Sequence, residues 1–170
     1  LDDANLTDAN LQDAFLISAS LNYAYLNRAN LSKASLIGAN LTGANPSHAI
    51  AIETNFSNAN LSEVNFSNAN LTKAKLDSTN LTKTNFSNAN LSHSNLSKAK
   101  AIATKFKTAT LTGICIENWV IDDKTNLEKA ICEYIYLKEN KQERRPLNLV
   151  QSFAAEEFSQ IFRDILETKS

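Results

Sequence analysis

A five-residue period runs through most of this chain and restricts the folds that it can adopt. Leu or Phe recurs at positions 1, 6, 11, 16 and onward to 116, with 16 Leu and four Phe among 24 positions. The residue two places earlier is Ala in 16 of 23 cases, and Asn fills 13 of the 23 positions between the two columns. A fixed short repeat of this kind is typical of an elongated repeat architecture.

The spacing of the two columns fits neither a helix nor a long strand. A helix would spread a five-residue column around its whole surface, and a long strand would need strict alternation. The spacing of two and then three predicts a short extended stretch, a corner, and a repeat of both. The small residue and the Leu or Phe then point inward, whereas the Asn between them points out.

The repeat unit is similar to a known family. Ala4-Asn5-Leu6 and Ala89-Asn90-Leu91 resemble the pentapeptide-repeat family, and the resemblance covers at least residues 1–116. Members of this family are right-handed quadrilateral β-helices, so the resemblance implies an all-β solenoid with four sides to each coil. All three glycines, Gly38, Gly43 and Gly113, fall two residues after the central position, at the expected corner. Glycine is favoured there because it tolerates a positive φ.

The columns continue beyond residue 116 through one slip. Trp119 and Ile121 hold the register, and after residues 122–124 the columns resume one residue late. The resumed pairs are Thr125/Leu127, Ala130/Cys132 and Ile135/Leu137. We therefore predict a β-helix over 1–137, of about seven coils at the family's four sides of five residues each. The one-residue register slip near 122–126 should be a bulge at a corner.

The end of the chain has a different pattern. Residues 138–152 lack periodicity and are predicted to be a connector. An amphipathic helix is predicted over 153–168, with Ser152 as a candidate cap and Phe158 on its apolar face. We expect this helix to cap the open end of the solenoid core, and docking to another domain or protomer is the alternative.

Part of this tail also resembles a more specific group of proteins. The segments 132–138, 142–146 and 157–158 are similar to a segment that follows the repeats in multidomain cyanobacterial pentapeptide-repeat proteins. In those proteins the repeats are joined to kinase, Toll/interleukin-receptor-like or other signalling modules. The resemblance implies that this chain is an excerpt from a larger regulatory protein, and the absence of Met agrees with that expectation.

Bulk properties narrow the functional classes. The net charge of −1 gives no overall field for nucleic acid, and no run of about 18 apolar residues could span a membrane. Cys115 and Cys132 are too few for a disulfide framework and lack metal-ligand spacing. His48 and His93 fall on different sides, so they cannot form a dyad. We expect no enzyme, cofactor, metal or catalytic residue. The expected location is cytoplasmic, with the thylakoid lumen and the periplasm left open.

Outward-facing apolar residues are the candidate binding surface, because outward positions should be polar. Phe15, Ile17 and Ile37 are predicted on one side, and Ile50 and Ile52 on the neighbouring side, while Tyr23 and Tyr25 flank a corner. The competing interpretation is scattered surface hydrophobes with a local bulge at 46–52. An exposed apolar patch near the first coils would instead mark a protein partner.

Three functional hypotheses follow. The first is a non-enzymatic structural and protein-interaction scaffold of a cyanobacterial signalling protein, with an unidentified protein partner and a homodimer left open. The second, from the family resemblance, is a DNA mimic that protects gyrase. Such a mimic should be strongly acidic, whereas residues 1–116 hold seven acidic and nine basic side chains. The third is a modulator of a transcription factor, also known within the family.

Overall fold

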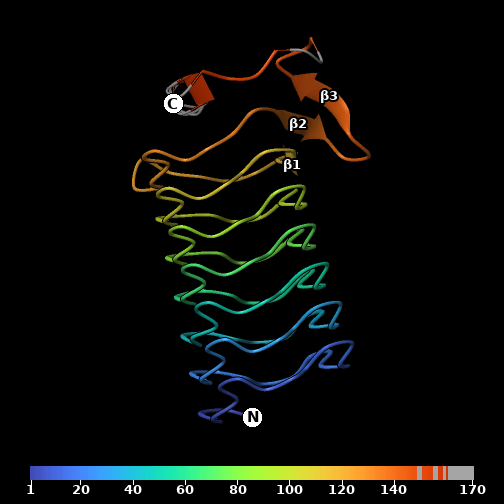
Figure 1. Cartoon of the computed structure of the whole chain (residues 1–170), viewed down its shortest axis with the longest axis vertical. Helices are drawn as coiled ribbons and strands as arrows, with labels where there is room; N and C mark the ends of the chain where they lie inside the picture. Colours follow the sequence, from blue (N-terminus) through green and yellow to red (C-terminus); the bar gives the residue numbers. More distant parts are fainter. Residues whose placement is uncertain (149–150, 155–156, 159, 161–170) are drawn as a thin grey trace.

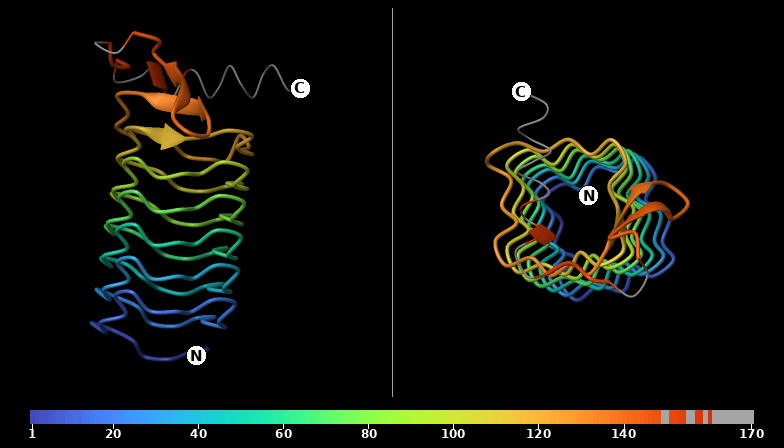
Figure 2. Two further views of the ribbon diagram at one scale, coloured as in Figure 1. Left: turned by 90° about the vertical axis from the view of Figure 1, so that its right-hand side faces the viewer. Right: turned by 90° about the horizontal axis from the view of Figure 1, so that it is seen from above.

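The computed structural model describes residues 1–148, 151–154, 157, 158 and 160. The chain winds into a stack of similar coils, with the N-terminus at one end and the C-terminal segment over the other (Figure 1). Seen along the axis, the coils superimpose into a four-cornered outline (Figure 2). Through most of the stack, parallel bridges join a residue between the two columns to the residue 20 places later, as in Asn5↔Tyr25 and Tyr25↔Asn45. This spacing confirms a repeat of four five-residue sides.

Most sides end in the same tight turn. The Ala24 amide donates to the Leu21 carbonyl at 3.2 Å, and Tyr23, the third residue of this turn, has a φ of 55°. A positive φ at that position is the mark of a type II turn. Asp3, Lys73 and Gly43 take the same place on other sides with φ of 55°, 59° and 68°. The corner predicted from the glycines is confirmed, although most corners are not glycine.

The interior consists of the two inward columns. Beyond the first coil, the Ala and Leu residues of these columns are almost fully buried up to Ala130, whereas Leu137 is partly buried. On one side Phe66, Phe86 and Phe106 stack with ring centroids 5.3 and 5.4 Å apart, and Trp119 meets Phe106 edge-on at 5.5 Å. Full burial of one such ring contributes about 1.5–3 kcal/mol.

Hydroxyl residues in the small column are also inside. Thr54, Thr84 and Thr104 each donate a hydrogen bond of 2.6–2.7 Å to a leucine carbonyl of the preceding coil. These bonds satisfy buried oxygens that would otherwise cost free energy. Threonine therefore substitutes for alanine here without leaving an unpaired polar group.

The predicted register slip is confirmed. Lys100 pairs with Val120, 20 residues on, but Lys105 pairs with Asn126, 21 residues on. Between these bridges Asp122 closes the extra turn. Its carboxylate accepts hydrogen bonds from the Ala103 amide and the Thr125 hydroxyl, both at 2.8 Å. The inserted residue is thus absorbed at one corner, while Ile135 returns to the core.

Regular strands occur only near the end of the described chain. β1 (Ile114–Cys115) pairs in parallel with β2 (Ile135–Lys138), which pairs antiparallel with β3 (Gln142–Arg145). The hairpin of β2 and β3 lies above the last coil (Figures 1 and 2). The segment predicted to be a connector therefore contains a strand. β3 is held by main-chain hydrogen bonds to β2, and such bonds leave no side-chain periodicity to detect.

The predicted C-terminal helix is described only in part. Glu157, Phe158 and Gln160 are helical, while Phe153 and Ala154 precede the helix, which therefore begins later than residue 153. The Ala154 amide donates to the Glu157 carboxylate at 3.0 Å, so Ala154 and not Ser152 occupies the capping position. Phe158 is 2% exposed and belongs to the core cluster. Residues 161–168 of the predicted helix lie outside the described residues.

Candidate interaction surface

One hydrogen bond distinguishes regular sides of the coil from irregular ones. On a regular side, the Asn between the two columns accepts a hydrogen bond at its Oδ1 from the amide two residues later. Examples are Thr42 to Asn40 at 3.2 Å and Thr82 to Asn80 at 3.1 Å. Where Asn is replaced by an apolar or basic residue, no side-chain oxygen is present at that place to accept the bond.

Six of the seven predicted surface residues lie on irregular sides. Phe15, Tyr25 and Ile50 occupy the Asn position itself. Ile17, Ile37 and Ile52 follow the central residue on sides that lack Asn, so their amides have no such acceptor. Each of these sides gives up a bond that contributes about 0.5–1.5 kcal/mol elsewhere in the stack.

The structure brings three of the predicted residues together. Phe15 is 87% and Ile17 56% exposed, and both lie on one side of the first coil. Ile37 is half-buried and stacks on Ile17 one coil above, as the hydrogen bond from the Ser18 amide to the Ile37 carbonyl shows. We call Phe15, Ile17 and Ile37 the apolar patch.

The other four predicted residues do not join this patch. Ile50, 44% exposed, and the half-buried Ile52 share the preceding side, higher in the stack. Tyr25 lies ten residues, half a coil, from Phe15 and so faces the opposite direction. Tyr23 stands at a corner, where its ring covers Gly43 of the next coil. The seven residues thus form one cluster, one pair and two separate tyrosines.

Four large exposed apolar residues of the described chain lie outside the predicted set, namely Leu1, Val120, Ile131 and Leu147. Val120 and Ile131 are 47% and 58% exposed, and bridges place them above Lys100 and Thr110. Both occupy the Asn position of their sides. An apolar residue at the Asn position could therefore have identified these two residues in the sequence. The same criterion works after residue 116 as well as before it.

The histidines and cysteines have structural surroundings. His93 packs against Gly113 and lies 6.4 Å from the Tyr134 ring, centroid to centroid. Burial raises the pKa of the Cys132 thiol far above its ordinary value and also raises that of the Cys115 thiol. A raised thiol pKa disfavours the nucleophilic thiolate. Among the described residues, no three His, Cys, Asp or Glu side chains gather as metal ligands.

Arg144 organises the segment over the last coil. Its guanidinium lies 4.4 Å from the centre of the Tyr134 ring and donates hydrogen bonds to the carbonyls of Pro146, Asn148 and Gln151. Its partners in the described structure are thus carbonyl oxygens and an aromatic ring. None of the described residues forms a helix long and apolar enough to cross a membrane.

The repeat matches two family models. The model described as pentapeptide repeats matches residues 1–43 and 29–68, and the model described as a pentapeptide repeat region matches residues 52–127. The chain belongs to the pentapeptide-repeat family. Proteins of this family adopt the right-handed quadrilateral β-helix that the sequence resemblance implied. No curated protein sequence matches the chain.

Solved structures of pentapeptide-repeat proteins are similar to this chain. HetL, involved in heterocyst differentiation regulation in the cyanobacterium Nostoc sp. strain PCC 7120, is 28% identical, with 82% of this chain and 68% of HetL covered and a TM-score of 0.47. Rfr23 from the cyanobacterium Cyanothece 51142 is 32% identical, with coverages of 64% and 63% and a TM-score of 0.32. QnrB1, a plasmid-mediated fluoroquinolone resistance protein, is 18% identical, with coverages of 77% and 80% and a TM-score of 0.40.

Proposed function

We propose that this chain is a non-enzymatic scaffold that binds a protein partner through the apolar patch of Phe15, Ile17 and Ile37. The observation that carries the proposal is the loss of the Asn hydrogen bond on both sides that build the patch. The outward Phe and Ile side chains add nothing to the core. These sides also lack the hydrogen bond that a backbone amide would donate to an Asn side chain. Departures from a stabilising local rule without a folding gain are expected at functional sites.

The rest of the rod supports a presenting role. In this proposal about seven coils of four sides, over residues 1–137, form a stiff stack whose far end is capped around Phe158. Each inner coil is joined to the coils below and above it by main-chain hydrogen bonds, so surface side chains are held at fixed positions. The scaffold would be part of a larger cyanobacterial regulatory or signalling protein and would act in the cytoplasm.

Mimicry of DNA is the weaker alternative. It requires a strongly acidic surface, because DNA carries one charge per about 1.7 Å of its axis. Residues 78–116 contain five lysines and no acidic residue. A partner that recognises DNA through basic side chains would be repelled by this part of the rod.

The test restores the regular side. In the variant Phe15→Asn/Ile17→Ser/Ile37→Ser, the side chain introduced at position 15 can again accept a hydrogen bond from the residue-17 amide. The free energy of unfolding should therefore rise or stay level while the apolar patch is lost. The partner is sought by affinity capture from a cyanobacterial lysate followed by mass spectrometry. We expect the variant to lose proteins that the unchanged chain captures.

Thr110→Asn is the matched control, because it introduces the same amide side chain several coils away from the apolar patch and leaves the exposed Ile131 one coil above it unchanged. It should keep the captured proteins. If the patch variant and the unchanged chain capture the same proteins, the proposed surface is wrong.

A further inference from the structure

A one-sided group of lysines lies two-thirds of the way along the stack. Residues 78–116 carry five lysines and no Asp or Glu, whereas residues 1–20 carry four Asp and no Lys or Arg. All five lysines are exposed. The 20-residue register places them around two adjoining sides, centred on Ala101 and Phe106. Some lie on these two sides, and the others lie at the two corners of the side centred on Ala101. We call them the lysine belt: Lys83, Lys98, Lys100, Lys105 and Lys107.

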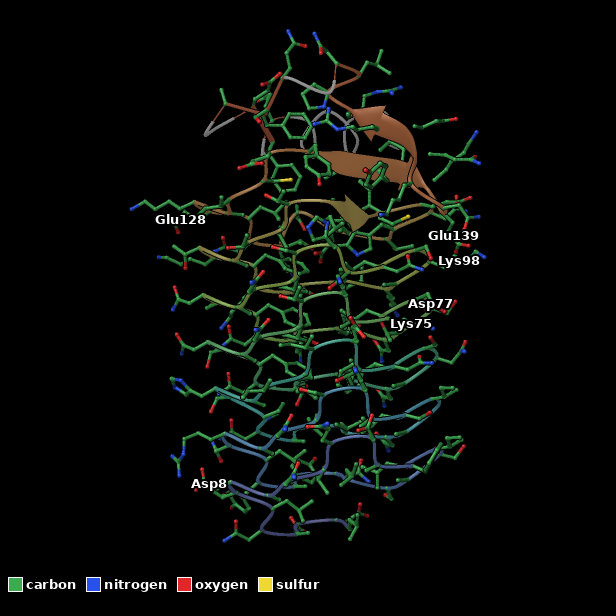
Figure 3. All side chains as sticks on the ribbon, turned by 45° about the vertical axis from the view of Figure 1, so that its right-hand side comes forward. Asp8, Lys75, Asp77, Lys98, Glu128 and Glu139 are labelled. Carbon is green, nitrogen blue, oxygen red and sulfur yellow. The ribbon has the colours of Figure 1, made fainter. Side chains whose placement is uncertain are left out.

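Only the margins of the lysine belt are neutralised. Lys83 pairs with Glu63 one coil below at 3.1 Å, and Lys107 pairs with Glu128 one coil above at 3.2 Å. Within the described residues, no carboxylate forms a salt bridge with Lys98, Lys100 or Lys105. Lys98 projects from the outside of the stack, below Glu139 (Figure 3).

Two of these lysines interrupt a stabilising pattern. Asn80 donates to the Asn60 side chain at 3.1 Å, and Asn85 donates to the Asn65 side chain at 3.1 Å, so each forms a ladder across coils. The next residues up, Lys100 and Lys105, end both ladders. They also remove the Asn acceptor for the amides two residues later. Lysine at these two positions weakens the repeat, as Phe15 does in the apolar patch.

The surroundings of the belt define the shape of its ligand. Glu63 lies below it, and Asp122, Asp123 and Glu128 lie above it, at a rise of about 4.8 Å per coil. Next to Lys98, the Glu117 carbonyl accepts a hydrogen bond from the Lys98 amide, and the Glu139 carboxylate accepts one from the Ser97 hydroxyl. A duplex or a membrane plane running along the rod would bring its phosphates against these carboxylates. In addition, no exposed Phe, Tyr or Trp lies within residues 78–116, so the bases of a single strand lack the large rings on which they usually stack. A short anionic segment that crosses the rod avoids both problems.

We propose that the lysine belt docks a short acidic protein segment, rich in Asp and Glu, that lies across the two adjoining sides. This inference rests on the proposed scaffold function only in that the ligand is a protein. The belt is several coils away from the apolar patch, so it adds a second docking surface with different chemistry.

The experiment measures fluorescence anisotropy of a labelled peptide of 15 Glu residues titrated with the whole chain at low and high salt. The variant in which the five belt lysines become Gln should bind about tenfold or more weakly, and the salt dependence should decrease with it. The matched control changes Lys33, Lys73, Lys75, Lys124 and Lys129 to Gln. Both variants move the net charge from −1 to −6, since each loses five lysines. The control should bind about as well as the unchanged chain.

Two outcomes would overturn the inference. Equal weakening in both five-lysine variants would mean that net charge and not the belt attracts the peptide. Tighter binding of a single-stranded 15-nucleotide DNA than of the peptide, lost in the belt variant, would make the belt a nucleic-acid site. Because the belt variant keeps Phe15, Ile17 and Ile37, capture through the apolar patch should persist in it, so the two proposals fail separately.

Discussion

The ring of Tyr23 packs against Gly43, the corner residue one coil above it. A Cβ added to Gly43 would lie 2.5 Å from Cε1 and 2.6 Å from Cδ1 of the Tyr23 ring, and the φ of Gly43 is +68°. Tyr23 is 58% exposed, so its ring can move aside, at the loss of this contact. Position 43 therefore favours glycine for two reasons, the positive φ of the backbone and the space that the Tyr23 ring occupies.

Gly43→Ala is expected to lower the free energy of unfolding by about 1–2 kcal/mol, measured by urea unfolding. Gly38→Ala is the control, because its added Cβ would meet only the Ser18 hydroxyl at 3.5 Å. It should lower the free energy of unfolding by the backbone contribution alone, about 1 kcal/mol. If Gly38→Ala and Gly43→Ala have equal effects, the Tyr23 contact contributes nothing.

Phe86 sits in the middle of the stacked rings, with Phe66 and Phe106 as its neighbours. Phe86→Ala should destabilise the chain by about 3–5 kcal/mol, because it opens a cavity that the rigid coils cannot collapse. Phe86→Leu places the commonest residue of the column there and should cost less than about 1.5 kcal/mol. Thermal unfolding followed by circular dichroism measures both, and a Leu variant as unstable as the Ala variant would contradict the packing argument.

Asp122 makes the register slip sensitive to acid. Its partial burial opposes the charged form, but hydrogen bonds from the Ala103 amide and from Thr125 outweigh this and hold the pKa of the carboxyl below its ordinary 3.8. A carboxyl whose pKa is lower in the folded state stabilises the fold at pH values above its ordinary pKa. This stabilisation is lost as the pH falls through the folded-state pKa. Asp122→Asn should therefore be less stable than the unchanged chain at pH 7, with a difference that shrinks below about pH 4.

Urea midpoints at a series of pH values measure this difference. Asp123→Asn is the neighbouring control, since none of these hydrogen bonds involves Asp123. A stability difference for Asp122→Asn that does not change between pH 7 and pH 3 would contradict the assigned role.

Arg144 should control access to the segment above the last coil. Arg144→Ala removes the donors to Pro146, Asn148 and Gln151, so limited proteolysis within 146–154 should become several-fold faster. Arg144→Lys is the informative comparison, because an ammonium group cannot reproduce the planar fork of the guanidinium. We expect it to restore little of the protection, whereas full protection in the Lys variant would show that charge alone is sufficient.

The regular part of this fold is predictable from the sequence because one five-residue rule decides every side. The inward columns, the left-handed corner at Gly43 and the slip before Asn126 all follow from that rule. β3 does not, since main-chain pairing with β2 leaves no pattern in the four residues Gln142–Arg145. The role of Arg144 was hidden for a similar reason. Carbonyl oxygens are present at every residue, so a sequence suggests a carboxylate partner first.

The grouping of the candidate surface on the sides of the coil was predictable, but its full membership was not, because Val120 and Ile131 are exposed as well. Outward Phe15 and Ile50 are visible as exceptions in the Asn column. Their exposed fractions required the structure, whereas the separation of Tyr25 from Phe15 by half a coil already follows from the expected coil of 20 residues. The lysine belt could have been found by following charge along the chain, because residues 78–116 contain no carboxylate side chain.

The 20-residue pairing of the regular coils also bears on how such rods can diverge. Inserting or deleting five residues would keep the inward columns and the corners while rotating all downstream side chains by a quarter turn. Only length changes in multiples of 20 would preserve the azimuth of one surface relative to another. Two relatives can thus align well and still present different faces to a partner. The surfaces of two relatives should therefore be compared by the position of each residue within the 20-residue coil and not by percentage identity.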